Sequence, residues 1–151
     1  MFLIVAGSID EMFRVKDPMV ECLAIVHSCK PGEIPINARQ VAQLAPSDEL
    51  FHDYRYAMKN GLFTDEWFKS VYVLRFLRDI SKNEEAKRLL RNLCMKSYNH
   101  DIFIGCFCEN PRLCHRTIVA NLLMGLGANI SGYDERWEYH YGMFKDYITS
   151  T

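Results

Sequence analysis

The sequence predicts an α/β fold in which a small, mostly parallel β-sheet is covered by helices. Three short apolar runs predict strands, at residues 1–7, 21–26 and 102–106. Their apolar residues are continuous rather than alternating, which indicates strands that are buried on both faces, as in a parallel sheet packed between helices. A long helical stretch separates the second run from the third, so we expect a helix-rich insertion between these two strands.

Capping residues divide this insertion into three helices. Ser47 or Asp48 can begin the first helix, Thr64 the second and Asn83 the third, because their side chains can accept hydrogen bonds from the first free N–H groups. We expect a further helix over residues 117–126, after the third strand, and a closing helix over the aromatic residues 133–147. The second helix has helical spacing over Trp67, Phe68, Val71, Leu74 and Leu77 or Arg78, which predicts an apolar face.

The composition fits one soluble domain. The chain has 151 residues, of which 49% are apolar, and a chain of this length buries about two-thirds of its unfolded surface. We therefore expect a single α/β domain over residues 1–151. The formal net charge of -1 does not support a nucleic-acid partner, although it does not exclude one.

The location of the protein is predicted from what the sequence lacks. The apolar first residues have no basic region of the kind that begins a secretory signal. No stretch approaches the roughly 20 apolar residues that a membrane-spanning helix needs. We expect a cytoplasmic protein with no membrane association.

Three of the six cysteines gather in one segment. A chain with no export signal and a sizeable core does not need a disulfide framework, so we expect thiols. Cys106, Cys108 and Cys114 lie between the third predicted strand and the helix that follows it. Residues 106–116 therefore form a strand-loop-helix unit, and ligands of α/β sheets bind beyond the carboxyl ends of the strands.

The start of the helix in this unit predicts an anion-binding site with a reactive thiol. Cys114 falls at the helix N-terminus, where free N–H groups and the helix dipole lower the pKa of a thiol. His115 could transfer a proton, and Arg112 or Arg116 could hold a phosphate or carboxylate. We predict Cys114 and His115 as catalytic residues; the structural alternative is that they only cap the helix and bond the loop.

The same segment offers two alternatives. Cys106, Cys108, Cys114 and His115 are a ligand set that zinc takes up tetrahedrally. Against zinc, the adjacent Cys114 and His115 are expected to diverge at a helix start, and the usual two-residue spacing between paired ligands is absent. We therefore predict no metal or cofactor and keep zinc as the alternative.

The second alternative is a phosphate-binding loop. Cys106 and Arg112 are separated by five residues, as in the loop that cradles phosphate in cysteine phosphatases. That loop points successive backbone N–H groups inward. Here Pro111 removes one of these donors and the loop contains no glycine, so we do not favour this interpretation.

Two motifs resemble a known family. The Leu-Ala-Pro-Ser element at residues 44–47 and the Cys-His-Arg triplet at residues 114–116, eight residues after the strand cysteine, resemble the Domain of Unknown Function 488 family. The resemblance spans residues 1–126. It implies a Rossmann-like α/β fold with these elements gathered at one end of the sheet, and it implies no established reaction.

This sequence departs from the family pattern at one position. Where the family usually has a glutamate two residues after the strand cysteine, this chain has Cys108, and Glu109 follows one place later. An aromatic residue between two cysteines, followed by proline and Cys-His, also resembles the Domain of Unknown Function 4326 family, with a gap one residue longer here. We assign Cys106, Glu109 and Ser47 to the ligand site together with the two arginines.

Two functions follow from these observations. The first is an enzyme or binding protein for a small anionic ligand, such as a nucleotide or nucleoside derivative, at residues 106–116. The second is a non-enzymatic module that binds nucleic acid or protein and whose cysteine cluster is structural. The sequence does not name a substrate, and it leaves open whether the protein is an enzyme.

Overall fold

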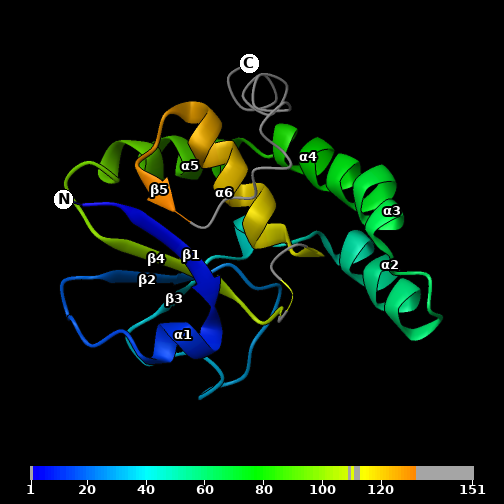
Figure 1. Cartoon of the computed structure of the whole chain (residues 1–151), viewed down its shortest axis with the longest axis horizontal. Coiled ribbons are helices and arrows are strands. Elements are labelled where there is room, and N and C mark those ends of the chain that lie inside the picture. Colours follow the sequence, from blue (N-terminus) through cyan, green and yellow to red (C-terminus); the bar gives the residue numbers. More distant parts are fainter. Residues whose placement is uncertain (1, 109, 111–112, 132–151) are drawn as a thin grey trace.

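Five parallel strands form one sheet in the computed structural model, which describes residues 2–108, 110 and 113–131 (Figure 1). The strand order is β3-β2-β4-β1-β5. The α/β fold and the strands expected near residues 1–7, 21–26 and 102–106 are therefore confirmed. The strands are β1 (Ile4–Ser8), β2 (Glu21–Ala24), β3 (Arg39–Gln40), β4 (Ile102–Cys106) and β5 (Ile130–Ser131).

Helices cover both faces of this sheet. Helices α5 and α6 lie on one face and α1 lies on the other, while α2, α3 and α4 extend to one side (Figure 1). No helix within the described residues combines the length and apolar character needed to cross a membrane. The helical segments are α1 (Ile9–Phe13), η1 (Ala42–Leu44), α2 (Asp48–Lys59), α3 (Asp65–Trp67), η2 (Phe68–Tyr72), α4 (Val73–Ser81), α5 (Glu84–Lys96) and α6 (His115–Leu126).

The predicted capping residues begin the helices of the insertion. Ser47, Thr64 and Asn83 each accept a hydrogen bond from the backbone N–H three residues further on. Helix α6 ends at Gly127, whose φ of 93° is left-handed and therefore suits glycine. The helix expected over residues 133–147 lies outside the described residues, and the single-domain organisation of residues 1–151 stays a prediction.

The sequence reading missed two strands, β3 and β5. Each has only two residues, which is too short to show an alternating or continuous apolar pattern. The side chains of β3, Arg39 and Gln40, are exposed at the edge of the sheet. The helix-rich insertion therefore begins with a short edge strand that pairs with β2.

The predicted apolar face of the second helix was wrong at Leu74, which is 44% exposed. Residues 68–72 form a π-helical turn, and a π turn contains more residues than an α turn, so it shifts the positions that face inward. After this turn the buried residues include Tyr72, Val73, Phe76 and Leu77.

Strand β4 lies at the centre of the sheet and orients the cysteines. It pairs with β1 on one side and β2 on the other. A methyl group added at Gly105 would lie 2.9 Å from the end of Met12 in α1, so this residue faces α1. Because successive strand residues face opposite ways, Cys106 points to the side covered by α6.

Two glycines opposite each other on β1 and β4 provide a test of this packing. Gly7 pairs with Gly105, and a Cβ at Gly7 would lie 2.7 Å from the ring of Phe103. We expect Gly7→Ala to lower the free energy of unfolding by about 1–3 kcal/mol, because the buried ring must move. Gly105→Ala is the matched control and should cost less, because the end of Met12 is flexible. Urea denaturation of both variants checks this; an equal or larger loss for Gly105→Ala would contradict it.

Candidate functional site

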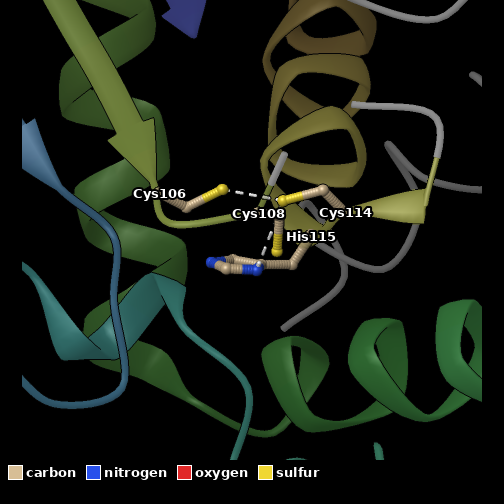
Figure 2. A group of neighbouring side chains, drawn as sticks. All are labelled: Cys106, Cys108, Cys114 and His115. Atoms are coloured by element: carbon tan, nitrogen blue, oxygen red, sulfur yellow. Dashed lines mark hydrogen bonds between the residues drawn. The ribbon is translucent and has the colours of Figure 1, made fainter. Parts of the chain in front are cut away.

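Three cysteines and a histidine converge between the end of β4 and the start of α6 (Figure 2). Cys106 is the last residue of β4, Cys114 is the N-cap of α6 and His115 is the first residue of that helix. Cys108 comes from the loop between them. One ligand atom from each residue can be chosen so that all four lie within 4.8 Å of one another. We call these four residues the Cys-His cluster.

The Cys-His cluster is closely packed and largely shielded from solvent. The sulfur of Cys106 lies 2.7 Å from that of Cys114, which in turn lies 3.9 Å from Nδ1 of His115. Cys106, Cys114 and His115 are buried, whereas Cys108 is partly exposed. Cys108 is therefore the cysteine of the cluster with the most access from solvent.

The expected divergence of Cys114 and His115 was wrong. Cys114 has an extended backbone, with φ of -136° and ψ of 144°, whereas His115 already belongs to the helix. Two adjacent side chains diverge when both residues are helical, but a change from extended to helical backbone between them alters their relative direction. The N-cap conformation thus brings both side chains to one site.

The ring of His115 has a defined orientation. Its Nε2 lies 2.5 Å from the backbone oxygen of Ile25, just beyond the end of β2. A carbonyl oxygen only accepts hydrogen bonds, so Nε2 carries the proton. In the neutral ring, Nδ1 then has a free lone pair, which faces the sulfur of Cys114.

Arg116 is buried beside the same sulfurs. Its guanidinium donates to the backbone oxygen of Cys108 at 3.1 Å and lies 3.9 Å from the sulfur of Cys106. The side chain, only 5% exposed, points to the Cys-His cluster. The role of Arg116 as a contact for an anionic ligand stays a prediction.

The three thiols differ in their affinity for a proton. Hydrogen bonds from Cys108 and Cys114 lower the pKa of Cys106, and electrostatic interactions with the neighbouring His115 and Arg116 act in the same direction. Burial, followed by the hydrogen bonds to Cys106 and Cys108, raises the pKa of Cys114 well above its usual value. The predicted lowering of the Cys114 pKa was therefore wrong, and burial of the thiol is the largest cause of the opposite shift.

A pocket of about 220 Å³ borders the Cys-His cluster. One wall is the segment of residues 26–28 that follows β2, and a second comes from Phe51, Tyr54 and Tyr72 of α2 and η2. The third wall is formed by Phe107, Cys108 and Leu113, which follow β4, and by His115 at the start of α6. We call this cavity the aromatic pocket.

Ring contacts hold the walls of the aromatic pocket. His27 and Phe51 are stacked, with their centroids 4.5 Å apart and an interplanar angle of 7°. Tyr54 and Tyr72 meet edge to face at 5.8 Å. The phenol of Tyr54 is hydrogen-bonded to the thiol of Cys108, and its pKa is raised, chiefly by burial. Tyr54 therefore remains a proton donor at neutral pH.

Sequence reasoning did not assign these aromatic residues to the site. Phe51 and Tyr54 are three positions apart, which places them on one face of a helix. That spacing equally describes a helix packed on a core, and no motif separates the two cases. His27 lies three residues after the end of β2 and contacts Asp48 through Nε2. Its place after an apolar run was the available signal for it.

The remaining predicted site residues lie elsewhere or outside the described chain. Ser47 caps α2 and donates a hydrogen bond to Asp79 at 3.0 Å. It lines a neighbouring polar pocket of about 300 Å³ rather than the aromatic pocket. Glu109 and Arg112 lie outside the described residues, so their assignment to a ligand site stays a prediction.

The fold and the site define an α/β protein with a cysteine-histidine cluster at the carboxyl end of a parallel sheet. A family model described as DUF488-N3a, active DUF488-N3 subclade, matches residues 15–126, which is more than half of the chain. The protein therefore belongs to the DUF488 family. Comparisons with curated proteins and with solved structures give no match. The weaker resemblance to the Domain of Unknown Function 4326 family stays a prediction.

The role of Ser47 can be tested with two small substitutions. We expect Ser47→Ala to lower the free energy of unfolding by about 1 kcal/mol and Ser47→Gly by only a few tenths, because glycine is tolerated at an N-cap. Both variants lose the hydroxyl group that bonds Asp79. Chemical denaturation checks the difference. Equal losses would mean that the hydroxyl contact, and not the cap, determines the effect.

Proposed function

We propose that the protein binds a small planar heteroaromatic molecule, of the nucleobase or nucleoside class, in the aromatic pocket and acts on it there. The observation that carries the proposal is the position of this pocket. Its lining includes Cys108 and His115, two members of the Cys-His cluster. A ring held between the aromatic walls would therefore touch the sulfur of Cys108.

The lining of the pocket supports a ring-shaped ligand. Phe51, Tyr54, Tyr72 and Phe107 provide aromatic surface, on which planar bases stack regardless of their substituents. The volume of about 220 Å³ is below the roughly 300–1,000 Å³ of pockets that bury drug-sized ligands. These two properties favour one ring system with a small substituent over a dinucleotide.

Polar groups at the edge of the pocket could orient such a ring. His27 and Ser28 lie on the wall that follows β2, and the hydroxyl group of Tyr54, which bonds Cys108, belongs to the wall formed by α2. A few well-placed donors and acceptors in an otherwise apolar pocket are what fixes the orientation of a small ligand. The exocyclic and ring nitrogens of a base can pair with both hydrogen-bond donors and hydrogen-bond acceptors.

The lining of the aromatic pocket gives less support to a phosphate or carboxylate group on the ligand. No lysine or arginine lines the aromatic pocket among the described residues. The guanidinium of Arg116 is directed at Cys106 and Cys108. The described lining supports recognition of a ring rather than of a phosphate group, so nucleosides are the first probes to use.

The proximity of the cluster favours an enzyme over a passive interaction surface. Cys108 is a potential nucleophile or metal ligand at the pocket wall, and His115 lies beside it. The matched subclade is described as active, which agrees with a site of chemistry.

Binding to the pocket can be tested by ligand-observed NMR. The probes are adenosine, guanosine, cytidine, uridine, adenine and uracil, and ribose is the non-aromatic control. We expect at least one aromatic probe to bind and Phe51→Leu to weaken its Kd about tenfold, because a lost stacking contact costs about 1–3 kcal/mol.

Tyr56→Leu is the matched control for this variant. Tyr56 lies on the same helix as Phe51 but is 61% exposed and does not line the aromatic pocket. We expect it to leave the Kd unchanged. The proposal fails if none of the aromatic probes binds, or if Phe51→Leu and Tyr56→Leu behave alike.

A further inference from the structure

We propose that Cys106, Cys108, Cys114 and His115 together bind one zinc ion. Three thiolates and one imidazole are a donor set found in structural zinc sites. These residues come from the end of a central strand, a loop and the start of a helix. This proposal is independent of the first one, because a nucleoside could bind in the aromatic pocket without zinc.

The donor atoms are close enough for tetrahedral coordination. Bond lengths of about 2.3 Å to sulfur and 2.0–2.1 Å to nitrogen imply separations of about 3.5–3.8 Å between the donor atoms. The distance of 3.9 Å between Cys114 Sγ and His115 Nδ1 fits this value. Cys106 and Cys114, now 2.7 Å apart, would separate by about 1 Å around the ion.

The orientation of His115 is that of a metal ligand. Its Nε2–H is engaged by the backbone oxygen of Ile25, so Nδ1 is left with its lone pair directed toward the sulfurs. Histidines that bind metals usually donate their other N–H to a carbonyl or carboxylate, which fixes both the tautomer and the ring plane.

The charges near the cluster balance when zinc is present. A zinc ion with three thiolates carries a net charge of -1, and the guanidinium of Arg116 carries +1. This buried cation has Cys108 O and Cys106 Sγ as hydrogen-bond partners within the described residues. A buried charge is costly without a counter-charge. The zinc-bound thiolates would supply that counter-charge at the required place.

Two ligands, Cys108 and His115, also line the aromatic pocket. Cys106 and Cys114 lie behind them and are almost fully buried. The ion would therefore sit beneath one wall of the pocket, with Cys108 as the ligand nearest to a bound molecule. In this position zinc would fix the loop after β4, which forms that wall.

The first test measures metal in the full chain, purified with a non-thiol reductant and without chelator. Elemental analysis should find about one zinc per chain, and Cys114→Ser should reduce this to near none. The matched control is Cys29→Ser, which removes a partly buried thiol that contacts Gln40 away from the cluster and should leave the zinc content unchanged. No nucleoside is added, so the result does not depend on ligand binding.

A second measurement covers the case in which Cys114→Ser fails to fold. The wild-type chain is stripped of metal and titrated with Co²⁺. We expect thiolate-to-cobalt charge-transfer absorption and the visible bands of tetrahedral cobalt, saturating at about one ion per chain. The proposal is overturned if zinc is absent after supplementation and Co²⁺ gives neither set of bands. A disulfide between Cys106 and Cys114 in the freshly purified, unstripped chain would overturn it as well.

Discussion

The burial of polar groups at the end of β4 is the constraint on which the site depends. Three thiols, an imidazole and a guanidinium meet there with little access to water. Buried polar groups are tolerated only when they satisfy one another. The strand position of Cys106, the cap conformation of Cys114 and the bond from His115 to Ile25 meet this requirement together.

The helix-rich insertion supplies the wall of the aromatic pocket that the sheet and the loop after β4 do not form. Helix α2 and the π-helical turn η2 bring Phe51, Tyr54 and Tyr72 to the carboxyl ends of β2 and β4. The shift in helical phase at η2 buries Tyr72 and exposes Leu74. A pocket therefore forms where a long crossover folds back on the sheet, at the edge where α/β proteins bind ligands.

The sequence predicted the parts of this fold that depend on local chemistry. Capping by Ser47, Thr64 and Asn83 follows from the side chain and its neighbours alone. The two-residue strands and the placement of β4 between β1 and β2 depend on pairing between distant segments, which no local pattern encodes. The cysteine segment was found from residue types, but its geometry was not, because the direction of Cys114 depends on one backbone turn.

The cluster and the pocket share one loop, and this links their properties. Phe107, Cys108 and Leu113 of that loop form a pocket wall, and His115 follows at the start of α6. The bond from Arg116 to the backbone of Cys108 and the bond between Tyr54 and the Cys108 thiol both hold the described part of the loop. Any change that loosens the cluster therefore also moves a wall of the pocket. The contacts that satisfy the buried thiols and the imidazole of the Cys-His cluster therefore also shape the aromatic pocket. This gives a reason for these groups to be buried and bonded to one another.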